Sequence, residues 1–366
     1  MTDSRDDSVA GSVSSSVTRA ADATEAPLGR VLTSLLRWGI PAATLAALGY
    51  VLSQDLSLQE LAQTLRQSAP EWLLLGLLVF ALTNVIRAAR SACLLGWRPL
   101  RSLSLVPTMF ASTLFKNVLP MRVGELSFPY LMQQHDVEWG RSLAILLVAR
   151  LLDLLVVCLL FLTAAASQLS LLPAPAQGLI AVAAVVSAVL LVLLAALPLL
   201  GRRALPDLVA WLTDRNWLPD KWQVRVSREV GKVQESLGIM ARRRVYGLAL
   251  FHSLLIWLST YAWFACFLRG IGWSIGFSRM ILGASFAVVS KSLPIGTIGG
   301  FGAHEAGWTL GFTLIGQEIG TAIVSGLVVN MLTLFSSALF GLASLVWMAW
   351  RSGRSLFSYM PEHTRK

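Results

Sequence analysis

The sequence has 366 residues, of which 55% are hydrophobic and 14% are charged, and its net charge is +10. Soluble domains carry about 25% charged residues, so this composition excludes an ordinary soluble protein, a disordered protein and a disulfide scaffold. It is typical of a polytopic membrane protein. In such a protein the excess of Lys and Arg gathers on the cytoplasmic side, and we do not take it to indicate nucleic acid. The three cysteines lie in apolar stretches, which favours buried thiols.

The chain begins with a polar, Ser-rich segment. Residues 1–30 contain five acidic side chains and precede the first apolar stretch, which argues against a secretory signal and against a transit peptide. We predict a disordered cytoplasmic tail over 1–30, a transmembrane domain over 31–350 and a second cytoplasmic tail over 351–366.

Six stretches meet or approach the length of about 20 mainly apolar residues that a transmembrane helix needs. They cover residues 35–53, 70–92, 139–163, 177–200, 246–268 and 319–350. Two further stretches, 104–132 and 276–316, are apolar but are interrupted by Pro, Gly and charged residues.

The charge of the connecting segments indicates whether the two interrupted stretches cross the membrane. The amphipathic loop 201–245 has a net charge of +5 and should be cytoplasmic, as should the basic C-terminal tail. The segment 54–71 has more acidic than basic residues and 164–176 has no charge, which suits the outside. Every connecting segment lies on the side that its charge indicates if each interrupted stretch enters and leaves the membrane on the same side. We therefore predict an all-α fold of six full transmembrane helices and two re-entrant broken-helix hairpins.

The same order of elements occurs twice in this prediction. Repeat one covers about 35–163 and repeat two about 177–350, and each contains two spans, a hairpin and a third span. Three crossings in each unit invert the second unit relative to the first. Inverted repeats with broken helices are typical of transporters, whose binding site lies where the breaks meet.

Polar and charged residues gather at the first break, next to a Pro and a Gly. The candidate site residues there are Lys116, Asn117, Pro120, Arg122, Gly124 and Glu125. Pro120 ends one half-helix, and the free backbone N–H groups of the next can hold an anion such as a lipid phosphate. The alternative is that Pro and Gly only kink a packed helix. Glu125 is a candidate proton carrier or partner for a cationic headgroup, with a helix cap as its structural alternative.

The second break has a similar composition. Its candidate residues are Lys291, Pro294, Gly296, Gly299, Gly300, His304 and Glu305. Glu305 has the same two interpretations as Glu125. His304 is either a proton relay or an interfacial hydrogen-bonding residue.

Two charged residues lie deep in the span 139–163. Arg150 and Asp153 can pair with each other at their i, i+3 spacing, or Arg150 can bind phosphate while Asp153 orients it. Arg87 and Arg90, near the cytoplasmic end of the second span, are expected to reach the lipid headgroups. The sequence contains no nucleotide-binding loop, zinc motif or cysteine cluster, so we predict no catalytic residues, no metal and no cofactor.

Three patterns together resemble the transmembrane region of the lysylphosphatidylglycerol synthases and the stand-alone flippase-like proteins related to it. They are Asn117-x-Leu119-Pro120-x-Arg122-x-Gly124-Glu125, Arg150-x-x-Asp153, and Pro294-x-Gly296-x-x-Gly299-Gly300-x-Gly302-x-x-Glu305. The resemblance spans about 35–350. It implies movement of a lipid between leaflets, and the absence of the aminoacyl-transfer domain that follows this region in the full synthases.

The leading hypothesis is a lipid translocase of the bacterial inner membrane that moves a phospholipid or a polyprenyl-phosphate-type lipid and is not an enzyme. Both termini would be cytoplasmic. Its partners would be membrane lipids with an anionic or phosphate headgroup and a cytoplasmic lipid-synthesis enzyme. Two alternatives stay open: a membrane glycosyl- or acyl-transferase that uses a lipid-linked donor, and an inverted-repeat transporter of small solutes.

Overall fold

The structure of the protein is a computed structural model. It describes residues 69–119, 123–168, 178–194, 196, 227–228, 230–235, 237, 243–292 and 298–353. All of the regular secondary structure in these residues is helical. The expected tail 1–30, the expected span 35–53 and residues 354–366 lie outside the described residues.

The described helices alternate between long spans and short segments. In chain order they are α4 (Pro70–Leu94), the 3₁₀ helix η2 (Pro99–Leu105), α5 (Val106–Val118), η3 (Val123–Leu126), α6 (Ser127–Met132), η4 (Gln133–His135), α7 (Trp139–Ala166), a helix over Gly178–Leu194, α10 (Arg243–Gly270), α11 (Phe277–Ser292), η6 (Ile298–Gly300), α12 (Ala303–Leu314) and α13 (Ile319–Ser352).

Four of the described helices are long and apolar enough to cross a membrane: α4, α7, α10 and α13. They confirm the helices predicted from the apolar stretches that begin at residues 70, 139, 246 and 319. The stretch predicted over 177–200 contains a shorter apolar helix, Gly178–Leu194, in the part that the structure describes. The chain is therefore a multi-pass integral membrane protein.

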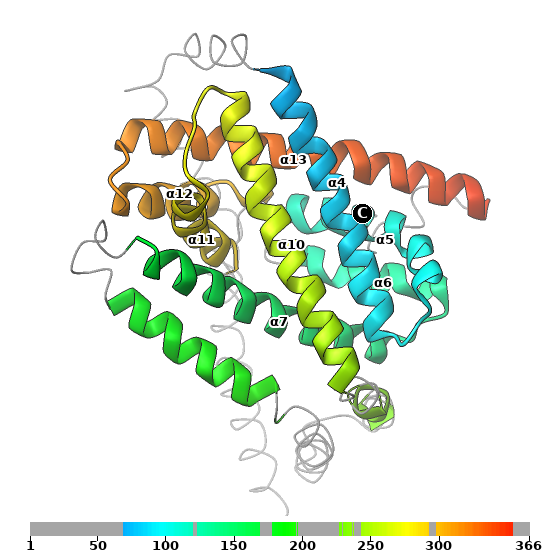
Figure 1. Ribbon diagram of the computed structural model, residues 1–366. Helices are drawn as coiled ribbons and strands as arrows, with labels where there is room; N and C mark the ends of the chain where they lie inside the picture. Colours follow the sequence, from blue (N-terminus) through cyan, green and yellow to red (C-terminus); the bar gives the residue numbers. More distant parts are fainter. Residues whose placement is uncertain are drawn as a thin grey trace, which may run out of the picture.

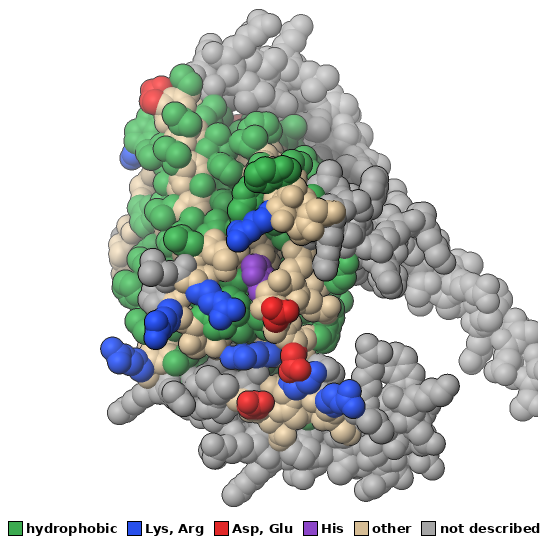
Figure 2. Space-filling model, turned by 90° about the vertical axis from the view of Figure 1, so that its right-hand side faces the viewer, with side chains coloured by type: hydrophobic (Ala, Val, Ile, Leu, Met, Phe, Trp, Pro, Cys, Tyr) green, Lys and Arg blue, Asp and Glu red, His purple; other side chains and the backbone are tan. Residues whose placement is uncertain are grey.

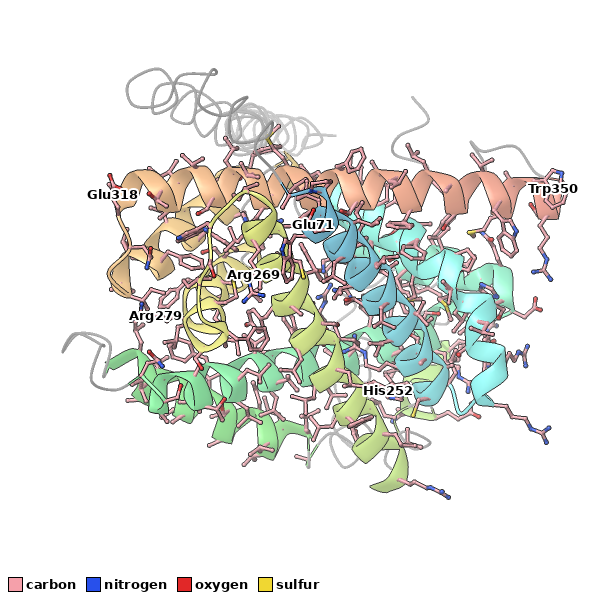
Figure 3. The ribbon with its side chains drawn as sticks, turned by 45° about the horizontal axis from the view of Figure 1, so that its top comes forward. Glu71, His252, Arg269, Arg279, Glu318 and Trp350 are labelled. Carbon is pink, nitrogen blue, oxygen red and sulfur yellow. The ribbon has the colours of Figure 1, made fainter. Side chains whose placement is uncertain are left out.

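Helices α4 and α10 lie side by side and run in opposite directions (Figure 1). The backbone N–H of Ala69, which precedes α4, donates to the carbonyl of Gly270 at the end of α10, at 2.8 Å. Glu71 and Arg269 lie toward this end of the pair, and His252 lies further along α10 (Figure 3). Gly76 of α4 leaves room for the ring of Phe267, so the two helices pack closely.

Each interrupted stretch forms a helix, a break and a second helix that packs back on the first. In the first stretch α5 is followed by the 3₁₀ turn η3 and the six-residue α6. In the second, α12 packs along α11, and Gly311 approaches so closely that a Cβ there would lie 2.1 Å from the carbonyl oxygen of Gly283. The breaks predicted from Pro and Gly are therefore real interruptions of helical structure.

The remaining two long helices, α7 and α13, pack against α10 and against the broken segments. Helix α7 contacts α10 and α11, and α13 contacts α5, α10 and α12. Aromatic side chains such as Trp308 and Phe312 fill the core between α10, α11 and α12. Residues at the breaks of both segments, Lys116 and Lys291 among them, line one cavity together with residues of α4, α7, α10 and α13.

Candidate functional site

A cavity of about 310 Å³ lies between these helices, and we call it the central cavity. Its charged and amide side chains come from both broken segments and from the long helices α4 and α7: they are Arg87, Lys116, Asn117, Glu125, Arg150, Asp153 and Lys291. A smaller cavity of about 100 Å³ shares five of them and adds Arg90. The fold thus brings together six of the residues predicted from the sequence, which come from segments up to 175 positions apart in the chain.

Asp153 pairs with Arg90 of α4. The two terminal nitrogens of Arg90, Nη1 and Nη2, both donate to the carboxylate. Arg90 also donates to the hydroxyl of Ser253 at 2.8 Å. The indole N–H of Trp257 donates to Asp153 at 3.1 Å. The prediction that Arg90 reaches the lipid headgroups is wrong. Helix α10 packs along α4, and Asp153 of α7 pairs with the Arg90 guanidinium, so this side chain is buried inside the bundle.

Arg150 pairs with Glu125, with 2.9 Å between the guanidinium nitrogen and the carboxylate oxygen. The i, i+3 pair between Arg150 and Asp153 that the sequence suggested does not form, because each side chain has a partner on another element. The Arg150–Glu125 contact joins α7 to the first break. Glu125 lies in the 3₁₀ turn η3 rather than at the start of a long half-helix.

Gly124 holds this turn against α5. A Cβ at Gly124 would lie 2.2 Å from the carbonyl oxygen of Phe115 and 2.6 Å from the Cα of Lys116. No side chain fits there, so the glycine sets the distance between Glu125 and the end of α5. Asn117 fixes the same end of α5 from another direction, since its amide donates to the hydroxyl of Ser337 on α13 at 2.6 Å.

We expect Gly124→Ala to destabilise the protein by about 1–3 kcal/mol, the usual cost of overpacking, because η3 must move away from α5. The measurement is the temperature at which half of the detergent-solubilised protein stays monodisperse. Gly247→Ala is the matched control, because a Cβ at that α10 position meets nothing within 4 Å. It should be neutral or slightly stabilising. Equal midpoints for Gly124→Ala and the wild type would contradict the packing argument.

Asn330 of α13 organises the second break. Its carbonyl oxygen accepts from the ammonium of Lys291 at 2.9 Å, and its amide donates to Glu305 at 3.0 Å and to the carbonyl of Gly299 at 3.3 Å. Glu305 also accepts from the backbone N–H of Gly302 at 2.6 Å, so the helix-cap interpretation of this residue is confirmed. Asn330 is fully buried. The sequence analysis missed it, although an Asn inside an apolar span is a signal of this kind.

The glycines of the second break have the backbone geometry that their clustering predicts. Gly299, Gly300 and Gly302 have φ values of 67°, 72° and 84°, in the left-handed region that glycine adopts without steric cost. Lys291 lies over Gly300, where a Cβ would meet its side chain. The predicted site residues Pro120, Arg122, Pro294 and Gly296 lie outside the described residues.

His304 is buried beside the central cavity but does not line it. Its ring packs against Trp308 and Phe264, with centroids 5.3 and 6.3 Å away, and neither ring nitrogen has a hydrogen-bond partner among the described residues. In the part of the chain that the structure covers, no group of His, Cys, Asp and Glu side chains could hold a metal ion.

Three cationic side chains that line the central cavity form no ion pair within the described ranges: Arg87, Lys116 and Lys291. Arg87 has only a 3.5 Å contact with the hydroxyl of Thr113, and Lys116 is exposed to the cavity. Because Asp153 and Glu125 already have arginine partners, the cavity carries an excess of positive charge. The sequence analysis had assigned Arg87 to the headgroup region instead.

A separate polar hollow of about 670 Å³ lies at one end of the bundle, where the structure brings together η4, the start of α5 and the end of α13. Charged side chains of both signs gather on this face (Figure 2). His135 contributes to the hollow and lies 2.9 Å from the hydroxyl of Thr108. Burial lowers the pKa of His135, Arg101 and Arg351 act in the same direction, and Asp136 opposes them.

Comparison with known proteins agrees with the membrane architecture. The family model for the lysylphosphatidylglycerol synthase TM region matches residues 32–341, and no aminoacyl-transfer domain is detected in this sequence. No curated protein and no solved structure matches the chain. Since the match covers most of the chain, including every residue that lines the central cavity, the chain belongs to the family of lysylphosphatidylglycerol synthase transmembrane regions.

Proposed function

We propose that this protein moves a lipid with a phosphate-bearing, net anionic headgroup between the leaflets of the bacterial inner membrane. The observation that carries the proposal is the set of three cations, Arg87, Lys116 and Lys291, that line the central cavity without an ion-pair partner in the described segments. A charge at the centre of a bilayer costs about 3 kcal/mol on insertion scales. Cations retained at that cost, from three different helices, favour an anionic ligand.

Helix geometry supports the same polarity. Lys116 and Lys291 lie in the last turns of α5 and α11, where the helix dipole stabilises a cation. The helix ends therefore stabilise a positive charge at both positions, and Asn330 also holds the Lys291 ammonium at 2.9 Å. The ordered pairs Arg90–Asp153 and Arg150–Glu125 hold the walls around them.

The proposal includes the inverted repeat expected from the sequence. Arg150 and Asn330 each lie eleven residues after the start of their helices, α7 and α13, and each contacts the glutamate of the preceding broken segment, Glu125 or Glu305. The antiparallel packing of α4 and α10 is what two oppositely oriented units would produce. In this arrangement the breaks are re-entrant, and the cavity lies at their meeting point.

The orientation that we propose follows the distribution of charge. Arg98 precedes η2 and Arg101 lies in it, close to His135 of the polar hollow, and Arg141 donates to the carbonyl of Leu95 just after α4. We place the end of the bundle with the polar hollow in the cytoplasm, because loops rich in Lys and Arg stay on that side. The N- and C-terminal tails are then both cytoplasmic.

The test is lipid translocation in proteoliposomes. Headgroup-labelled phosphatidylglycerol, a labelled polyprenyl phosphate and labelled zwitterionic phosphatidylcholine are exposed to a membrane-impermeant quencher. We expect the wild type to expose the inner-leaflet pool of an anionic lipid and not that of phosphatidylcholine. Lys116→Gln and Arg87→Gln should each slow this about 10–100-fold, since a hydrogen bond to a charged group contributes about 1.5–3 kcal/mol.

Lys232→Gln is the matched control for these variants. Lys232 is a cation of the same type that pairs with Glu138 at 3.1 Å, away from the central cavity. It should leave the rate unchanged. Equal rates for the anionic lipids and phosphatidylcholine, or wild-type rates for both cavity variants, would refute an anion-selective translocase.

A further inference from the structure

The central cavity also has an apolar side. Leu154 and Val157 of α7 and Val288 and Val289 of α11 line it there. On α7 this apolar surface follows directly on the charged one, because Leu154 lies about one turn after Arg150 and Val157 about one turn after Asp153. A single ligand in this cavity can therefore contact both charged and aliphatic side chains.

Exposure shows that the apolar side is open to the outside of the bundle. Leu154 is 39% exposed and Val289 is 46% exposed, although both line the cavity, whereas Phe264 on its inner wall is buried. Because Leu154 and Val289 are apolar, line the cavity and are also exposed, we take them to lie at its mouth. The mouth is then between α7 and α11, and α7 is one of the helices long and apolar enough to cross a membrane.

The volume of the cavity limits what can enter it. About 310 Å³ corresponds to roughly ten water molecules at ~30 Å³ each. This accommodates a phosphate-bearing headgroup but not the acyl chains of a lipid as well. The acyl chains of any bound lipid must therefore lie outside the cavity. The mouth between α7 and α11 suits them because apolar side chains line it.

We propose that the acyl chains of the bound lipid leave the central cavity between α7 and α11, across Leu154 and Val289. This inference rests on the proposed function, since it assumes that the anionic headgroup belongs to a membrane lipid. The lipid enters sideways from the bilayer, with its phosphate on the cations and its chains in the hydrocarbon layer. Transfer of the chains through the protein interior is not required.

A second apolar groove distinguishes this route from a general affinity for lipid. It has a volume of about 380 Å³, lies between α7 and α10, and is lined by residues that include Leu159 and Phe251. None of the charged cavity residues contributes to its lining. Leu159 is 40% exposed, about as much as Leu154, and lies on the same helix. It is the matched control position.

The first measurement compares Leu154→Trp with Leu159→Trp in the proteoliposome assay. Leu154→Trp should slow translocation of phosphatidylglycerol at least 10-fold because the indole fills the mouth, and Leu159→Trp should leave it unchanged. Val289→Trp closes the mouth from α11 and should have the same effect as Leu154→Trp, which covers the case in which one variant folds poorly. Wild-type rates for both mouth variants, or a loss confined to Leu159→Trp, would overturn the proposal.

The second measurement locates the chains without relying on transport. Wild-type protein in vesicles that contain a phosphatidylglycerol with a photoreactive acyl chain is irradiated, and the labelled peptides are identified by mass spectrometry. We expect label on the Leu154 and Val289 peptides that excess unlabelled phosphatidylglycerol removes. Label confined to the Leu159 and Phe251 groove contradicts the route. Competed label at the mouth with no translocation by the wild type would support the route and refute the proposed transport.

Discussion

Replacing Asp153 with Leu is expected to lower stability by about 3–5 kcal/mol, the cost of leaving a buried charge without its partner. Asp153 accepts from Arg90 and from the indole of Trp257, and both charged side chains are buried. Removal of the carboxylate leaves the buried Arg90 guanidinium with Ser253 as its one remaining acceptor among the residues that the structure describes. The midpoint for loss of monodisperse protein in detergent should fall by roughly 5–10 °C.

The double variant Arg90→Met, Asp153→Leu separates the ion pair from the shape of the site. It removes both charges together, and we expect it to recover most of the lost stability, because apolar replacements of a buried pair are often neutral. Glu138→Gln is the control for an ion pair at the surface, since Glu138 is largely exposed and pairs with Lys232, and it should cost less than about 1 kcal/mol. A double variant as unstable as Asp153→Leu would show that the loss comes from packing and not from the unpaired charge.

Asn330→Leu is expected to have the second largest effect. The substitution keeps the approximate volume but removes the acceptor for Lys291 and the donor for Glu305 in one step. Because hydrogen bonds to charged groups contribute about 1.5–3 kcal/mol each, the expected loss of stability is about 3 kcal/mol. Translocation should fall more than 10-fold, because Lys291 is no longer held at the cavity.

Asn84→Leu is the matched control for this variant. Asn84 is also a fully buried asparagine in a long apolar helix, but its partners are neutral: the carbonyl of Phe80 and the hydroxyl of Thr113. Its loss should cost only about 1 kcal/mol. Thermal midpoints and proteoliposome rates are measured for both. Equal losses for the two asparagines would show that the charges at the second break do not depend on Asn330.

Much of the membrane architecture follows from the sequence. The apolar stretches beginning at residues 70, 139, 246 and 319 form long helices, and the Pro- and Gly-rich interruptions at 104–132 and 276–316 break helical structure. Both results depend on local chemistry. A helix needs about 20 apolar residues to span a bilayer. Pro removes a backbone hydrogen bond and Gly disfavours the helix, so a segment that contains both interrupts helical structure. The inverted repeat and the re-entrant path of the breaks remain predictions.

The sequence by itself determined the fold class, the family resemblance and most of the charged and amide residues that line the central cavity, because an ionisable residue in an apolar span stands out at any position. Only the tertiary structure decided their partners. Arg90 pairs with Asp153 and Arg150 with Glu125, and Asn330 joins Lys291 to Glu305. These contacts link helices far apart in the chain, whereas spacing within one helix reports only neighbours three or four residues away. The excess positive charge of the cavity could be recognised only after both carboxylates had been assigned to their arginines.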